Sequence, residues 1–159
     1  MTDNNFAGYG QKLYDMLIKC KLNTLFPIEG CSEDEIEMVR LRQKVDFLPQ
    51  VYREFLGVMG RHGGDLFLGS DFSIRSVTTL KDDVIHDLKR FRRKFRVPKD
   101  AVIFLDHGGY ADWYFHTEDR NDDPPVYLYS GEHDSAEKIA DHLSEFLESS
   151  IREYAPNCQ

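Results

Sequence analysis

The segment from residue 48 to residue 64 decides the fold, and it reads LPQVYREFLGVMGRHGG. Its apolar side chains are spaced at i, i+3, i+4 and i+7, as on one face of an α-helix. They are Tyr52, Phe55, Leu56 and Met59. Proline is tolerated at the first helical position, so this helix is expected to begin at Leu48-Pro49. It should stop near Gly60, and the pair Gly63-Gly64 permits a positive φ or a tight chain reversal.

Two further helices are predicted before this segment. In the first, apolar residues follow one another at steps of three and four from Phe6 to Cys20. The second begins at Ser32, where Glu35 three residues later completes a capping box. The chain therefore opens with three helices.

After the glycine pair the pattern changes to short strands alternating with longer elements. A fourth helix is expected over residues 82–96, and a last helix from about Ser135. The turn chemistry of Asp106-His107-Gly108-Gly109 joins two of the strands into a hairpin. The strands are expected at residues 65–69, 72–74, 101–105, 112–117 and 126–129. This order predicts an α+β fold, a central antiparallel sheet of four to six strands flanked by helices.

Composition limits the classes of protein to which the chain can belong. The 159 residues are 41% hydrophobic and 13% aromatic, which suits one packed domain rather than a disordered chain. The net charge of −8 makes sequence-independent nucleic-acid binding an unlikely function. No apolar run approaches the ~18–20 residues that a membrane span needs. The first residues lack the features of a signal peptide, so the expected location is the cytoplasm.

The three cysteines support the same location. Cys20, Cys31 and Cys158 are odd in number and show no CxxC spacing. We therefore expect reduced thiols rather than a disulfide framework.

The order of these motifs resembles the Smi1/Knr4 (SUKH) superfamily. The resemblance covers about residues 32–151, with residues 1–31 as a helical extension of one domain spanning 1–159. It comprises an LP-x-x-Y-x-x-FL…GG signature and a later strand that ends in D-x-G-G, followed by an aromatic strand. The matching positions, expected to be structural, are Leu48, Pro49, Tyr52, Phe55, Leu56, Gly63, Gly64, Asp106, Gly108 and Gly109.

The resemblance implies a protein-binding role without catalysis. Bacterial members of the superfamily are thought to be immunity proteins that neutralise toxins, often nucleases, and fungal members are interaction modules in cell-wall signalling. An immunity protein that binds a toxin domain is the first expectation, and a regulatory interaction module is the second. No cofactor is implied, and the oligomeric state stays open.

The residues by themselves offer weak candidates for chemistry. Asp106, His107, Asp112 and His116 lie on one hairpin and are the best candidates for a metal-dependent hydrolase, which is a distant third reading. Alternation along the strand separates the two histidines, so no metal site is predicted. Neither glycine pair belongs to a phosphate-binding motif, and no catalytic residue is assigned.

Charge is distributed unevenly along the chain. Residues 89–99 carry seven basic residues and no acidic one, on a predicted helix face that either is solvated or docks an acidic partner or RNA. An acidic rim follows and is the predicted surface for a basic toxin, because it can steer such a partner electrostatically. As exposed charges, its members should contribute little stability. They are Asp119, Asp122, Asp123, Glu132 and Asp134.

Overall fold

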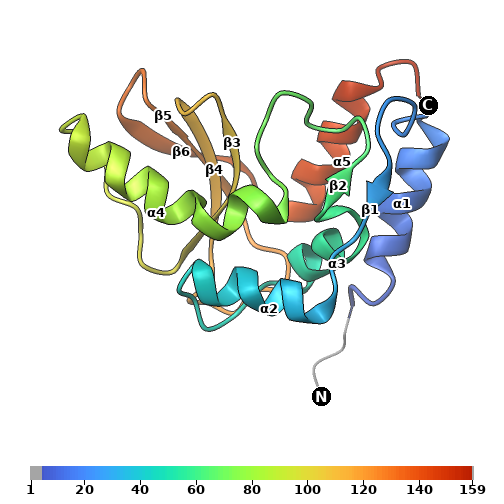
Figure 1. Cartoon of the computed structure of the whole chain (residues 1–159), viewed down its shortest axis with the longest axis horizontal. Helices are drawn as coiled ribbons and strands as arrows, with labels where there is room; N and C mark the ends of the chain where they lie inside the picture. Colours follow the sequence, from blue (N-terminus) through green and yellow to red (C-terminus); the bar gives the residue numbers. More distant parts are fainter. Residues whose placement is uncertain (1–4, 159) are drawn as a thin grey trace.

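A four-stranded antiparallel sheet forms the centre of the computed structural model, which describes residues 5–158. Its order is β3-β4-β5-β6, so each strand pairs with its neighbour in the chain (Figure 1). The strands are β1 Ile28–Glu29, β2 His62–Gly63, β3 Ala101–His107, β4 Ala111–His116, β5 Val126–Ser130 and β6 Ser135–Ala140. The helices are α1 Tyr9–Lys19, α2 Glu33–Arg42, α3 Gln50–Met59, α4 Ile74–Arg90 and α5 Leu143–Tyr154. The predicted α+β class and the size of the sheet are confirmed. Residues 1–4 of the predicted extension, and Gln159, lie outside the described part.

Helix α3 lies in the core, as its apolar spacing predicts. Phe55 is fully buried, and the ring of Tyr52 packs edge-on against Phe104 and Phe115 of the sheet, with ring centroids 6.2 and 5.2 Å away. Pro49 is the N-cap residue, one position before the first helical residue. The predicted capping box of α2 is also present, because Glu35 N–H donates to Ser32 and Ser32 N–H donates to Glu35.

The glycine pair makes the predicted reversal. Gly64 has φ +62°, and a Cβ there would lie 2.1 Å from the carbonyl oxygen of Leu22. A side chain at this position is therefore excluded twice, by backbone conformation and by space.

Two of the predicted strands are wrong. Residues 65–69 form turns, and of residues 72–74 the last already belongs to α4. The Asp65 carboxylate accepts hydrogen bonds from the backbone N–H groups of Thr24, Leu25 and Phe26. Residues 65–69 are therefore held by side-chain hydrogen bonds and not by pairing with another strand. A single bridge remains, in which Asp71 pairs with Asp106 of β3.

The predicted bounds of the last two helices are also wrong. Helix α4 spans Ile74–Arg90 instead of residues 82–96, and it ends in a Schellman arrangement with Arg92 at φ 53°. The N–H of Arg93 then donates to the carbonyl of Leu88 at 2.8 Å. Ser135 begins β6 rather than a helix, although Ala, Glu and Lys there favour helices. Pairing with β5 outweighs that local preference.

The cysteine prediction is wrong for two of the three residues. Cys20, after α1, and Cys158, near the C-terminus, form a disulfide across 138 residues of chain. Cys31 stays a free thiol. Helix α1, which precedes Cys20, and helix α5, which precedes Cys158, both contribute to one buried cluster, so the crosslink joins two segments that pack together. None of the helices in residues 5–158 has the length and apolar character that a bilayer span requires.

Candidate functional site

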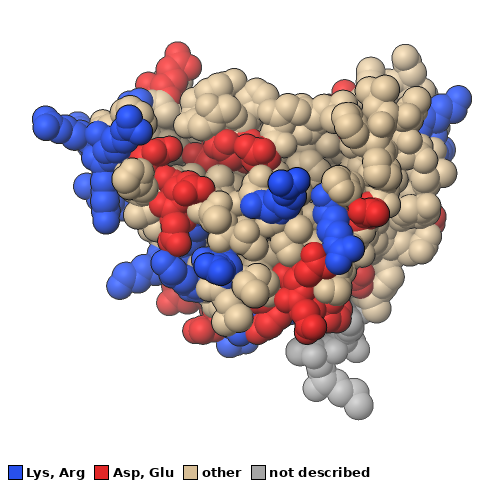
Figure 2. All heavy atoms as spheres, viewed as in Figure 1, with Lys and Arg blue, Asp and Glu red and all other residues tan. Residues whose placement is uncertain are grey.

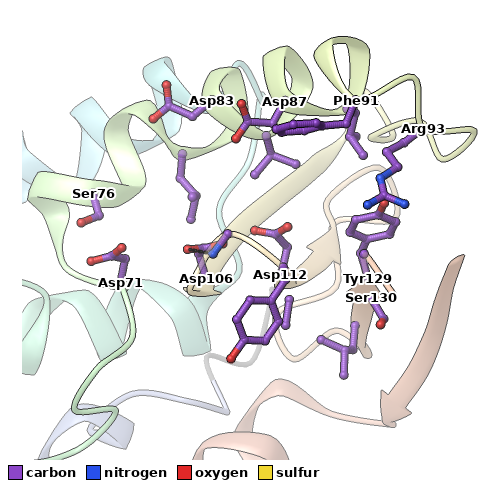
Figure 3. A pocket seen from close by; sticks show the side chains of 18 of the residues that line it. Asp71, Ser76, Asp83, Asp87, Phe91, Arg93, Asp106, Asp112, Tyr129 and Ser130 are labelled. Atoms are coloured by element: carbon purple, nitrogen blue, oxygen red, sulfur yellow. Dashed lines mark hydrogen bonds between the residues drawn. The ribbon is translucent and has the colours of Figure 1, made fainter. Parts of the chain in front are cut away.

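A groove with a volume of about 840 Å³ separates α4 from one face of the sheet. Figure 3 shows carboxylates on both of its walls. Six acidic and two basic residues line it. The acidic residues are Asp71, Asp83, Asp87, Asp106, Asp112 and Glu132, and the basic ones are Arg75 and Arg93. In Figure 2 the red carboxylates gather beside α4, and blue basic atoms extend from its C-terminal end.

The floor of the groove is a row of three aspartates on neighbouring chain segments. Asp71 and Asp106 exchange two backbone hydrogen bonds, of 2.8 and 2.9 Å, and Asp106 is paired with Asp112 across β3 and β4. Residues directly opposite each other in antiparallel strands point to the same face, so the three carboxyls are neighbours. Asp71 lies 35 residues before Asp106 and 41 residues before Asp112 in the chain, so it joins the row only in the folded structure.

Asp112 is the most perturbed group of this row. Its side chain is 4% exposed, and its Oδ1 has no hydrogen-bond partner among the described residues. Loss of solvent, and then the hydrogen bond and negative charge of Asp106, raise its pKa to about 8. Asp87 of α4 adds to this repulsion. Near neutral pH the carboxyl therefore holds a proton, and the pair behaves as one coupled acidic unit.

The rim of the groove is aromatic. Phe91 and Tyr110 are about 60% exposed and lie at its mouth. Tyr129 is paired with Asp112 across β4 and β5, and its hydroxyl donates to Asp134 at 3.0 Å. Carboxylates accept N–H donors and aromatic rings attract cations, so this arrangement has the chemistry to accept a cationic group.

The structure divides the predicted acidic rim into two. Asp119, Asp122 and Asp123 precede β5, whereas Glu132 and Asp134 follow it, so they lie at opposite ends of that strand. Asp119 and Glu132 are exposed.

The other three acids of the predicted rim hold backbone N–H groups. Asp122 Oδ1 accepts from Gln50 N at 3.1 Å, at the N-terminus of α3. Asp123 accepts from the backbone N–H and the hydroxyl of Ser144, at the start of α5. Asp134 accepts from Lys94 N and Phe95 N, and these bonds, the first above all, lower its pKa. Asp122 and Asp123 are therefore half-buried, hydrogen-bonded groups rather than the exposed charges that the sequence predicts.

The hairpin residues considered for a metal do not converge. His107 bonds Ser70 at 2.8 Å, in a second cavity on the other face of the sheet, and His116 bonds Asp100 at 2.9 Å. Of the four hairpin residues, Asp106 and Asp112 line the groove, and His107 and His116 do not. Within residues 5–158, no three metal-ligating side chains have the geometry of a metal site.

The other predicted motif residues have structural positions. Leu48, Tyr52, Phe55 and Leu56 are buried, and Gly108 and Gly109 have φ values of +65° and +78° in the β3–β4 turn. The basic stretch of residues 89–99 is not one helix face, because α4 ends at Arg90.

The sequence did not predict that acidic residues line both walls of the groove. The only available signals were an Asp at each end of the hairpin turn, and Asp83 and Asp87 one helical turn apart.

Comparison with known proteins agrees with the fold. The profile of the SUKH_6 family, described as SMI1-KNR4 cell-wall, matches residues 33–147. Members of this family are in general protein-interaction domains without catalysis. No curated protein matches the chain. Because the family profile covers well over half of the sequence, the chain belongs to the SMI1/KNR4 (SUKH) family.

Proposed function

We propose that the protein is an immunity protein that binds and neutralises a toxin domain with a basic surface, such as a nuclease. The observation that carries this proposal is the acidic groove between α4 and the sheet, with its buried Asp106–Asp112 pair. Enzymes that bind nucleic acid present Lys and Arg to phosphates, and an acidic groove of this size is complementary to such a surface.

The overall charge supports the same role. A net charge of −8 and six acids around one groove attract a basic partner from a distance and speed the encounter. The exposed acids Asp119 and Glu132 lie outside the groove floor and can contribute to this steering. The toxin must meet its inhibitor where it acts, which for an intracellular nuclease is the cytoplasm.

A regulatory interaction module is the second candidate. The matching family profile is itself described by its cell-wall members, and a module of that kind would use the same groove for a different protein. The neighbouring genes separate the two roles, since an immunity gene lies beside its toxin gene.

A protection assay tests the immunity role. The gene product encoded next to this protein is expressed in a sensitive host with and without it. We expect growth to be restored only in its presence, and the purified pair to associate at least tenfold faster at ~10 mM than at ~150 mM salt. Equal killing in both strains would contradict the proposal.

The predicted docking surfaces can be compared in the same purified system. If acids steer the toxin, replacing Asp119 and Glu132 with their amides lowers the association rate, and the difference shrinks as salt increases. If the exposed basic residues dock the partner instead, Lys89→Glu with Arg93→Glu weakens binding and the amide variants do not. An unchanged rate in both sets would reject electrostatic docking through these four residues.

A further inference from the structure

We propose that the Asp106–Asp112 pair is the receptor for one arginine side chain of the partner protein, which enters the groove between α4 and the sheet. This inference rests on the proposed function and adds the chemical group that is recognised and the place where it binds. The occupant is a protein segment that carries a guanidinium group, not a metal ion or a nucleic acid.

The pair is held in place before any partner arrives. Asp106 and Asp112 occupy opposite positions of β3 and β4, and both are more than nine-tenths buried. Asp106 Oδ1 accepts the backbone N–H of Gly109 at 3.1 Å, which fixes its carboxyl at the end of the hairpin. Tyr129 of β5 lies opposite Asp112 on the other side of β4, so the pair is enclosed by strands on both sides.

One acceptor atom of the pair is left without a donor. Asp112 Oδ1 is inaccessible to solvent and has no hydrogen-bond partner among the described residues, although Asp112 lines the groove. A buried acceptor without a donor costs free energy, and a donor brought by a ligand removes that cost. The pair therefore has acceptor capacity that no described residue uses and that a ligand with N–H groups can use.

The surroundings select a positive charge. Asp71 lies beside the pair, on the loop before α4, and Asp83 and Asp87 line the groove from α4 (Figure 3). Glu132 and Tyr129 also line the groove, and Arg93 lies over Tyr129 on one side of it. Arg75 lines the groove from the first turn of α4. Acids outnumber these bases three to one in the lining, so a cation is attracted.

Arginine fits this arrangement better than lysine. A guanidinium is planar and has five N–H donors, so it can bridge two adjacent carboxyls, whereas an ammonium is a point charge. The exposed rings of Phe91 and Tyr110 at the mouth offer surfaces on which a guanidinium stacks. A volume of about 840 Å³ is in the range of pockets that hold drug-sized ligands, which leaves room for flanking residues of a peptide.

Binding of arginine has a proton signature. In the free protein the pair retains a proton near neutral pH, because of burial and mutual repulsion. A guanidinium favours the fully ionised pair, so binding displaces that proton. The affinity should therefore rise with pH below about pH 8, by at most tenfold per unit.

The test uses a blocked tri-arginine peptide as probe and a tri-citrulline peptide of the same shape without charge as its control. Binding to the full chain is measured by calorimetry at ~10 mM salt, in two buffers of different ionisation enthalpy, and by amide NMR shifts. We expect tri-arginine alone to bind, to release a proton, and to shift the amides around residues 106, 112 and 129. Asp112→Asn should weaken binding at least fivefold and abolish proton release.

Two further Asp→Asn variants serve as a charge-matched control and as a second test of the groove. Asp34→Asn removes the same charge from an exposed position in the first turn of α2, which does not line the groove, and should change the affinity less than twofold. Asp87→Asn, on the exposed wall of α4, replaces Asp112→Asn as the test if the latter fails to fold, and it should weaken binding about threefold. Circular dichroism checks the fold of each variant.

Three results would overturn the inference: no binding of tri-arginine, equal binding of tri-citrulline, or equal affinity of Asp112→Asn and wild type. Its failure differs from a failure of the proposed function. If a toxin is neutralised equally well by Asp112→Asn, the arginine receptor is wrong and the immunity role stands. If tri-arginine binds as expected but the neighbouring gene product is not neutralised, the receptor stands and the immunity role is wrong.

Discussion

Gln43 and Ile103, 60 residues apart in the chain, are joined by a reciprocal pair of hydrogen bonds. Gln43 Oε1 accepts from Ile103 N at 3.1 Å, and its Nε2 donates to Ile103 O at 2.8 Å. The side-chain amide thus pairs with the free edge of β3 as a strand would. Its Nε2 also donates to Val77 O at 2.8 Å, so one fully buried residue joins α2, α4 and the sheet.

Replacing Gln43 should destabilise the protein strongly. In Gln43→Leu three buried backbone groups lose their partners, and we expect the free energy of unfolding to fall by about 2–4 kcal/mol. Urea denaturation measures this change. Gln11→Ala, which removes an exposed side-chain bond to Asp15, is the control and should stay within about 0.5 kcal/mol. A Gln43→Leu variant as stable as this control would show that the three bonds do not hold the elements together.

Asp112→Asn should stabilise the free protein at neutral pH. The folded pKa of Asp112 is raised above its unfolded value, so the folded state binds more protons and wild-type stability falls as pH rises from about 4 to 8. The slope from this group is at most about 1.4 kcal/mol per pH unit. The amide does not titrate, so the variant should gain about 1–3 kcal/mol near pH 7 and nothing near pH 4.

Thermal or urea unfolding between pH 4 and 8 tests this pH dependence. The range ends there because burial lowers the pKa of Lys81 to about 8, and its titration makes stability rise with pH above that value. Parallel wild-type and variant profiles would mean that Asp112 is not buried in protonated form.

The two aspartates at the helix starts should matter more for stability than their neighbour. Asp122→Ala and Asp123→Ala each remove acceptors from N-terminal N–H groups, of α3 and α5 respectively, and should cost about 0.5–2 kcal/mol. Asp119→Ala, in the same loop but exposed, should cost less than about 0.5 kcal/mol. Denaturant titration compares the three. A loss as large for Asp119→Ala would point to a different role for this loop.

Reduction of the Cys20–Cys158 disulfide should lower stability without unfolding the core. The crosslink spans 138 residues, and removing such a constraint from the unfolded chain typically costs about 2–4 kcal/mol. We expect dithiothreitol and the double variant Cys20→Ser/Cys158→Ser to lower the midpoint of unfolding equally. Mass spectrometry of protein made in a reducing cytoplasm shows which form is present there. If dithiothreitol leaves the midpoint unchanged, the two thiols are not bonded in solution.

The elements that were predicted correctly carry their information within a few residues. The face of α3 from Tyr52 to Met59 repeats with helical period, and the Ser32–Glu35 capping box spans one turn. The strands around the Gly108-Gly109 turn are joined by a local hairpin. In each of these, the side chains that stabilise the element are neighbours in the chain, so the sequence alone determined the α+β class and the family signature.

The misjudged elements depend on contacts with other segments of the chain. Residues of β6 have local helical preference, but hydrogen bonds to β5 make them a strand. Phe91 and Phe95 fit a continued helix, yet the chain turns at Arg92, and Phe95 stacks on Tyr129 at 4.5 Å instead. Tertiary contacts outweigh propensities that differ by less than about 1 kcal/mol per residue.

The candidate site belongs to the same class of nonlocal features. The sequence determined that acids are abundant and that Asp106 and Asp112 flank a hairpin turn. Only the tertiary structure decided that Asp71 joins their row, that α4 closes the groove above them, and that Asp112 is buried with an unpaired oxygen. Burial and electrostatic coupling depend on what surrounds a group in space, and this chain assembles those surroundings from the loop before α4, from α4 itself and from strands β3, β4 and β5.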